Sequence, residues 1–368
     1  MNRNLARSIW VYTILVIAIG LLALYSASSH NVRVEQKIFY DQLTFACIGL
    51  VVMYVIGKID YKHFYDIAYI FYIANAVLLI SVLFAGRHAL GATRWIVVAG
   101  ISFQPSEIAK LSLILALGRY FSNRRPSLSF GFLNRAQVLI RDLIIPFVIA
   151  GIYMIMVFKQ PDLGTSILLF GIFVVMLFLS GIRIKYLTIF MGTLLSIVPF
   201  AWKLLKPYQK DRLLVFLNPN IDPLGAGYTI IQSKIAVGSG QLFGKGWLAG
   251  TQNTLNFLPE RHTDFIFSVI GEEWGLLGAL FLIYCFFNLI MCGLKITERL
   301  KDKFGMLTCA GIVCILTLQV VINIGMVLGL FPIVGLTLPM VSYGRTSFCI
   351  FIFMMGYLIN LSRERTVF

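Results

Sequence analysis

Repeated long apolar runs constrain this chain more than any other feature of its sequence. Hydrophobic residues make up 59% of the 368 residues, and charged residues only 13%. A helix of roughly 20 apolar residues is long enough to cross the hydrocarbon core of a bilayer. Several runs reach that length, and a soluble protein of this size could not bury so much apolar surface. We therefore expect an all-α, polytopic membrane protein.

The pattern predicts about ten transmembrane helices in a single domain over residues 1–368. They are expected near residues 8–27, 41–57, 64–85, 104–121, 142–158, 163–181, 185–202, 265–294, 304–330 and 345–362. The connector between the seventh and eighth, residues 203–264, mixes polar residues with prolines and glycines. It is expected to form a large extracytoplasmic loop. The first run lacks a small-residue cleavage site after it, which favours a retained helix over a signal peptide.

The positive charges of the chain predict its orientation. The formal net charge is +15, which in a soluble protein would suggest a nucleic-acid partner. Here the basic residues fall in short connectors, and such connectors face the cytoplasm. With ten spans, one side receives Arg3, Arg7, Lys58, Lys62, Arg119, Arg124, Arg125, Arg135, Arg141, Arg183, Lys185, Lys295, Arg299, Lys301, Lys303, Arg363 and Arg365. We expect both termini in the cytoplasm and no nucleic-acid partner.

Cysteines and histidines give no spacing that indicates a metal or redox site. The six cysteines lie in apolar runs without a CxxC pair, which favours structural packing. The four histidines are scattered along the chain. No set of metal ligands is therefore predicted from the sequence.

Four polar segments stand at the predicted outer ends of spans. They are QPSEIAK (104–110), KQPDLGTS (159–166), ERHTDFIF (260–267) and SYGRTS (342–347). A charged side chain near the bilayer centre costs about 3 kcal/mol or more, so ionisable residues within spans indicate function. Four such segments at one depth predict a polar cavity that opens toward the outer leaflet.

Helix capping is the simpler interpretation of each acid taken alone. Asp162 and Asp264 each precede a span and could act as N-caps. Pro105 followed by Glu107 is typical of a helix start. Capping does not explain Lys110, which lies three residues from Glu107 on the same face and opposes the helix dipole. Lys110 therefore needs a partner, while both interpretations of Asp264 stay open.

A glycine-rich run, AVGSGQLFGKGWLAGTQN (236–253), lies in the large outer loop. Glycines let backbone N–H groups approach an anion closely, although a merely flexible loop has a similar composition. Outside the third span, GATRWI supplies an arginine and a tryptophan, and the tryptophan is equally suited to anchoring at the interface. The candidate substrate-binding residues are Glu107, Lys110, Trp95, Arg94, Asp162, Arg212, Lys245, Arg261 and Ser342.

Taken together, these motifs make the chain resemble the SEDS family (shape, elongation, division and sporulation) over its whole length. The resemblance rests on QPSEIAK, QPDLGTS, the glycine-rich loop, ERHTDFIF and the SYG segment. LPERHTDFIFSVIGEEWG is most similar to the rod-shape branch of the family. Family members often read SYGG, whereas Arg345 and Thr346 follow Gly344 in this chain.

The resemblance implies a peptidoglycan glycosyltransferase of the cytoplasmic (inner) membrane that polymerises lipid II at its outer face during cell elongation. The GlcNAc 4-hydroxyl of one lipid II would attack the MurNAc anomeric carbon of another, forming a β-1,4 bond and releasing polyprenyl diphosphate. The implied catalytic residue is Asp264, with important roles for Glu107 and Lys110. The implied partners are a class B penicillin-binding protein, which is a transpeptidase, and the elongation machinery.

Three further expectations accompany the resemblance. Mg²⁺ or another divalent cation would suit the diphosphate, although no motif requires it. A lipid II flippase is the alternative function. Transporters usually place their ionisable site near the bilayer midplane, whereas the polar segments here lie at the outer ends of spans, which favours the enzyme. A non-catalytic scaffold for other wall enzymes is a third possibility.

Overall fold

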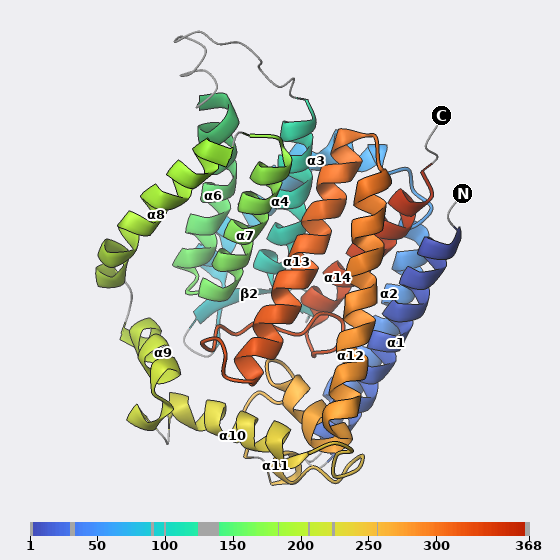
Figure 1. Ribbon diagram of the computed structural model, residues 1–368, viewed down its shortest axis with the longest axis vertical. Coiled ribbons are helices and arrows are strands. Elements are labelled where there is room, and N and C mark those ends of the chain that lie inside the picture. Colours follow the sequence, from blue (N-terminus) through green and yellow to red (C-terminus); the bar gives the residue numbers. More distant parts are fainter. Residues whose placement is uncertain are drawn as a thin grey trace.

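The computed structural model describes residues 3–29, 34–89, 92–98, 101–123, 140–182, 184–204, 207–222, 225–255 and 257–364. Helices of 15 to 34 residues make up most of the molecule, and most of them form a bundle (Figure 1). They are α1 (Arg3–Ser29), α2 (Val34–Ile56), α3 (Lys62–Ala85), α4 (Pro105–Ser122), α6 (Ile145–Lys159), α7 (Leu163–Leu179), α8 (Ile184–Leu204), α12 (Ile266–Arg299), α13 (Lys303–Val327) and α14 (Arg345–Ser362). Each of the predicted spans overlaps one of these helices.

Among the described residues, seven helices are long and apolar enough to cross a membrane, and α7 is a shorter apolar helix. One of the seven joins α6 to a single π-helical turn, η1 (Ile140–Ile144). The helices bury one another, while their outer faces expose large apolar side chains, as expected of a protein surrounded by lipid. The chain therefore has the architecture of an integral membrane protein.

Helix α13 lies inside the bundle and contacts α4, α7, α12 and α14. Close approach depends on glycine, because a Cβ on Gly311 would stand 2.8 Å from the Ile114 side chain of α4. Small residues of this kind let membrane helices pack tightly. Polar side chains on α13 are thereby placed within reach of several helices at once.

The large loop contains helices of its own. They are α9 (Pro207–Leu217), the 3₁₀ turn η2 (Pro219–Ile221), α10 (Ala226–Ser239) and the short α11 (Thr251–Thr254). These elements lie across one end of the bundle, and the start of α1 and the end of α14 lie at the opposite end (Figure 1). We call the two ends the loop end and the basic end.

The eighth predicted span, 265–294, is not one continuous helix. Helix α12 consists of two helices joined at Gly275, whose backbone has φ 65° and ψ −163°. A Cβ at this position would meet the backbone N of Gly244 at 2.3 Å, so both the backbone conformation and the contact require glycine. The sequence pattern missed this break because both halves are apolar.

The first half of α12 packs against α10. Ser268 and Ser233 share a hydrogen bond of 2.9 Å, and a Cβ on Gly271 would lie 3.2 Å from Val237. Small side chains at these two positions therefore give α12 a narrow packing face, and Gly275 ends the first helix.

A small antiparallel sheet interrupts the otherwise helical chain between α3 and α4. Its strands are β1 (Arg87–Ala89), β2 (Ala92–Val98) and β3 (Ile101–Phe103), in that order. The all-α expectation overlooked them because each strand is short and stands outside the apolar runs. Strand β2 carries both Arg94 and Trp95, and Trp95 pairs with Arg87 of β1.

Candidate functional site

The four polar segments meet at the loop end of the bundle. Gln104 Nε2 donates to Asp162 Oδ2 at 3.2 Å, which joins the first segment to the second. The Gln104 N–H donates to Thr346 Oγ1 at 3.1 Å, which joins the first to the fourth. The Tyr343 N–H donates to the His262 carbonyl at 2.8 Å, which joins the fourth to the third. The predicted convergence is therefore confirmed.

Lys110 has the partner that its position demanded. Pro105 opens α4, and one turn later Lys110 Nζ lies 2.6 Å from Glu107 Oε2. The lysine side chain is 0% exposed, and its ammonium also donates to Gln319 Oε1 at 3.0 Å. Since an ammonium carries three donors, one remains beyond these two contacts. A charge is thus held, paired, inside the bundle.

Asp162 is a helix cap, as the simpler interpretation proposed. Its Oδ1 accepts the Thr165 N–H at 3.2 Å at the start of α7. The other oxygen accepts from the hydroxyls of Thr165 at 3.0 Å and Ser106 at 3.3 Å. This buried carboxylate therefore also ties α7 to the start of α4.

Asp264 does not occupy the N-cap position of α12. The N-cap residue is Phe265, and no side chain caps the helix there. The Asp264 carbonyl accepts from Asn323 Nδ2 at 2.9 Å. Its Oδ2 lies 3.6 Å from the place that a Cβ on Gly335 would occupy. The half-buried Asp264 therefore stands against the segment that follows α13.

The α13–α14 loop, residues 328–344, forms the centre of this region. Asn323 Nδ2 donates to the Leu336 carbonyl at 2.6 Å, and Gln319 Nε2 donates to the Thr337 carbonyl at 2.9 Å. Both amides are fully buried. Neither amide was among the predicted site residues, although two polar residues four apart in an apolar span indicate a shared polar face.

Lys245 is already paired within the protein. Its Nζ lies 2.8 Å from Glu272 Oε1 and 2.7 Å from Thr251 Oγ1. The Glu272 side chain is 1% exposed and accepts the Gln252 N–H at 3.1 Å as well. Lys245 thus balances a buried carboxylate, and its charge is only partly available to a substrate.

The glycine-rich run lies against the backbone of α12. The N–H groups of Lys245 and Gly246 donate to the carbonyls of Glu272 and Glu273, both at 3.0 Å. A Cβ on Gly244 would stand 2.1 Å from the Glu273 carbonyl oxygen. Close contact with α12 accounts for the glycine, and these two N–H groups are not available to an anion.

Two predicted substrate-binding arginines hold backbone carbonyls. Arg261, 3% exposed, donates to the carbonyls of Ala27 and Asn253, both at 3.0 Å. Arg94 donates from Nε to the Gln160 carbonyl at 3.1 Å and from Nη2 to the carbonyl of the next residue. Both guanidinium groups brace loops at the loop end.

Three predicted site residues remain: Ser342, Trp95 and Arg212. Ser342 Oγ accepts the Leu338 N–H at 2.8 Å and donates to the Thr263 carbonyl at 2.5 Å, so it closes the α13–α14 loop onto the Asp264 segment. Trp95 is half-buried on β2. Arg212 belongs to α9, and its side chain lies outside the described residues.

Two acids that the sequence analysis passed over are buried at the end of the first half of α12. Glu272 binds Lys245, as described, and Glu273 accepts a hydrogen bond from Ser26 of α1. Both side chains are at most 2% exposed. Adjacent acids inside a predicted span were a signal of buried pairing.

The arginine that departs from the SYGG pattern forms an ion pair. Arg345 Nη2 pairs with Asp41 of α2, and its guanidinium lies over the Phe45 ring at 5.9 Å. The first turn of α14 is thereby joined to α2 by a contact that a glycine could not make.

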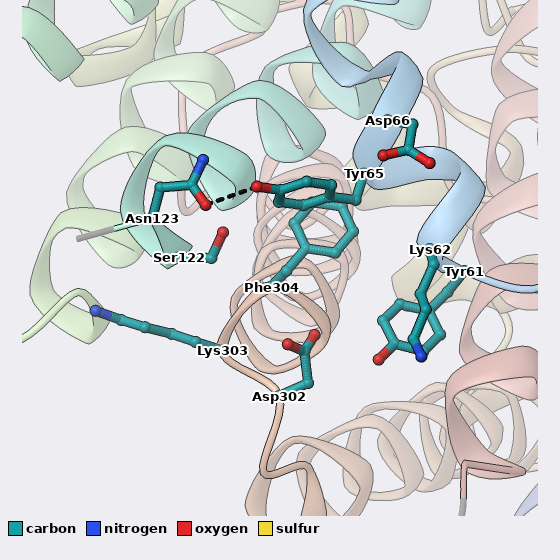
Figure 2. Close-up of a pocket in the computed structure, with 9 residues that line it drawn as sticks. All are labelled: Tyr61, Lys62, Tyr65, Asp66, Ser122, Asn123, Asp302, Lys303 and Phe304. Atoms are coloured by element: carbon teal, nitrogen blue, oxygen red, sulfur yellow. Dashed lines mark hydrogen bonds between the residues drawn. The ribbon is translucent and has the colours of Figure 1, made fainter. Parts of the chain in front are cut away.

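A pocket of about 460 Å³ opens at the basic end, between α3, the end of α4 and the start of α13 (Figure 2). Lys62, Asp66, Asp302 and Lys303 line it, and none of the predicted site residues does. Tyr61 also lines it, and burial raises the pKa of its phenol above the ordinary value. This pocket is therefore separate from the polar segments at the loop end.

Within the described ranges, no three His, Cys, Asp or Glu side chains gather into a group that could hold a metal ion. A Mg²⁺ ion is often bound by only one or two carboxylates together with substrate phosphates.

Known proteins resemble the chain along nearly its full length. Peptidoglycan glycosyltransferase MrdB of Escherichia coli K12 is 40% identical over 364 residues, covering 96% of this chain and 93% of that protein. Stage V sporulation protein E of Bacillus subtilis is 36% identical over 363 residues, covering 96% of this chain and 95% of that protein.

Solved structures are also similar to this chain along nearly its full length. A chain from a study of how a peptidoglycan synthase complex coordinates polymerization and crosslinking superposes with a TM-score of 0.81, at 29% identity, covering 98% of both chains. The rod shape determining protein RodA of Thermus thermophilus gives a TM-score of 0.71 at 26% identity, covering 97% of this chain and 96% of that one. A family model described as cell cycle protein FtsW/RodA/SpoVE matches residues 6–367. With its four polar segments joined and this match along its whole length, the chain belongs to the FtsW/RodA/SpoVE family, the SEDS proteins.

Proposed function

We propose that this chain is a peptidoglycan glycosyltransferase that polymerises lipid II during cell elongation, with Asp264 as its catalytic base. The observation that carries the proposal is the place of Asp264, which stands where the polar segments meet, with its carbonyl bonded to Asn323 of α13 and its carboxylate beside Gly335. The 40% identity to the E. coli glycosyltransferase MrdB supports the reaction class.

The reaction requires one proton transfer and one displacement. The 4-hydroxyl of the acceptor GlcNAc attacks the anomeric carbon of the donor MurNAc, and the bond from that carbon to the diphosphate oxygen breaks. Asp264 takes the hydroxyl proton, and the polyprenyl diphosphate leaves with the bonding electrons. A positioned carboxylate base contributes about 10²–10⁴-fold to such a step. Inversion at the anomeric carbon follows from a single displacement.

The leaving diphosphate needs charge neutralisation more than it needs an acid. Lys110 can direct its remaining donor toward a substrate oxygen, and Glu107 keeps that lysine in place. Mg²⁺ or another divalent cation bound to the diphosphate oxygens would supply further positive charge. Chelation by EDTA is expected to lower the rate, and Mg²⁺ is expected to restore it.

The loop end is proposed to face the extracytoplasmic side, with both termini in the cytoplasm. The start of α1 and the end of α14 share the opposite end (Figure 1). Lys62 at the start of α3, Arg119 in the last turn of α4 and Lys303 at the start of α13 are basic residues of the same end. Basic connectors face the cytoplasm in membrane proteins. Cysteine labelling from outside, in a background without native cysteines, should modify a cysteine placed at Gln252 before the membrane is permeabilised.

A class B penicillin-binding protein is the proposed partner. Support comes from the similarity to a chain solved in a study of a peptidoglycan synthase complex. That study concerns the structural coordination of polymerization and crosslinking. Co-purification with such a transpeptidase, and a change in the polymerisation rate on its addition, would test the pairing.

The deciding substitution is Asp264→Asn, assayed with purified protein and purified lipid II. An amide keeps the shape and hydrogen-bonding capacity of the side chain, but it does not take up the proton. The variant is expected to reach the membrane normally and to make no glycan. Polymerisation near the parental rate would remove Asp264 from the chemistry. Movement of lipid II across vesicles without polymer would favour the flippase.

A further inference from the structure

Two buried amides on α13 have no place in the reaction as described so far. Gln319 and Asn323 lie four residues apart, so they share one face of the helix. Both side chains are 0% exposed. Buried polar groups are costly unless their atoms are bonded, and each amide uses its NH₂ group on carbonyls of the α13–α14 loop.

Gln319 connects that loop to the buried cation. Its Oε1 accepts from Lys110 Nζ at 3.0 Å, and its Nε2 donates to the Thr337 carbonyl at 2.9 Å and to the Thr337 hydroxyl at 3.3 Å. A single side chain thus links the ammonium on α4 to one peptide group of the loop.

Asn323 connects the neighbouring peptide group of the loop to the segment that carries Asp264. Its Nδ2 donates to the carbonyls of Leu336 at 2.6 Å and Asp264 at 2.9 Å. The adjacent Gly335 lies so close to the Asp264 carboxylate that a Cβ would stand 3.6 Å from Oδ2. Because Leu336 precedes Thr337, the two amides hold adjacent positions of one short segment.

We propose that Gln319 and Asn323 are positioning residues that fix the distance between Lys110 and Asp264 through the α13–α14 loop. The inference rests on the proposed function of Asp264. Neither amide needs to touch the substrate. Catalytic groups must be held within a fraction of an ångström, and a displacement of about 1 Å can lower a rate 10²-fold.

The competing explanation is that the two amides only form hydrogen bonds with nearby buried polar groups and have no effect on the spacing of Lys110 and Asp264. Gln319→Glu separates the two. The carboxylate retains an oxygen for Lys110 and loses the NH₂ group that reaches Thr337. A parental kcat in this variant would mean that the contacts to Thr337 do not affect the rate. If Gln319 sets the spacing, kcat falls about 10-fold or more while KM for lipid II changes less than about 3-fold.

Asn323→Leu tests the other half of the path, since it removes both carbonyl contacts and leaves those of Lys110 intact. The same loss in kcat with little change in KM is expected. Thr317→Val is the matched control, because the Thr317 hydroxyl on the same helix donates only to the Val313 carbonyl of its own helix. The control should keep the parental kcat and KM.

Thermal unfolding is measured for every variant, so that a loss of rate in a folded protein is distinguished from unfolding. A parental kcat in folded Gln319→Glu or folded Asn323→Leu overturns the inference, and either variant carries the test if the other does not fold. Asp264→Asn is assayed in parallel. Activity of Asp264→Asn defeats the proposed function itself, whereas its inactivity beside fully active amide variants defeats the positioning role alone.

Discussion

The two ends of the bundle use charge in opposite ways. At the loop end, Lys110 and Glu107 form a buried ion pair, and Glu272 holds Lys245 from inside the protein. At the basic end, the charges line an open pocket or face the surroundings (Figure 2). Charge at the basic end therefore costs little free energy, whereas the buried charges at the loop end must be matched by partners.

Removing Lys110 should give the largest effect in this comparison. Lys110→Met leaves Glu107 buried without its cation, and breaking a buried pair in this way costs about 3–5 kcal/mol. We expect a strongly lowered unfolding temperature and loss of polymerisation. Thermal unfolding in detergent and a lipid II polymerisation assay measure the two effects.

The double variant Lys110→Met with Glu107→Gln separates stability from function. Neutral partners of similar size should recover most of the stability, because no uncompensated charge is left. Activity should stay lost if the ammonium acts in the reaction. A double variant that polymerises at the parental rate would make the pair purely structural.

A smaller effect is expected for Lys245, whose side chain is 29% exposed. Lys245→Met should lower the unfolding temperature, because Glu272 loses one of its donors, while KM for lipid II changes less than about 2-fold. A several-fold rise in KM with unchanged stability would instead make Lys245 a substrate-binding residue. Thr254→Val serves as a nearby control, since its hydroxyl donates only to the Thr251 carbonyl.

The Arg345–Asp41 pair should contribute less again, because both side chains are partly exposed. Exposed and half-exposed pairs contribute about 0–1 kcal/mol. A double-mutant cycle with Arg345→Gly and Asp41→Asn should give a coupling energy of that size from unfolding measurements. A coupling energy well above 1 kcal/mol would contradict this expectation and would place the pair with the buried ion pairs of the loop end.

Neutralising the pocket at the basic end should give the smallest effect. Lys62→Gln and Lys303→Gln are expected to leave the polymerisation rate within about 2-fold and the unfolding free energy within about 0.5 kcal/mol, as for most surface substitutions. A large loss of rate in either folded variant would show that the two ends are functionally connected, contrary to the comparison.

Much of the site could be predicted because hydrophobicity and charge act locally along the chain. An apolar run long enough to cross a bilayer predicts a span. The depth of a polar residue follows from the number of residues between it and the end of the run. That counting was enough to expect the four polar segments at one level and a partner for Lys110, both of which the structure confirms. It also predicted the cap at Asp162.

The tertiary structure alone decided which polar groups were already bonded. Arg94 and Arg261 appeared free to bind a substrate, yet both hold carbonyls of distant residues, and the glycines beside Lys245 serve contact with α12. The break at Gly275 likewise depends on a backbone more than thirty residues away. Hydrogen-bond partners far apart in the chain are chosen by packing, and no periodicity in the sequence records that choice.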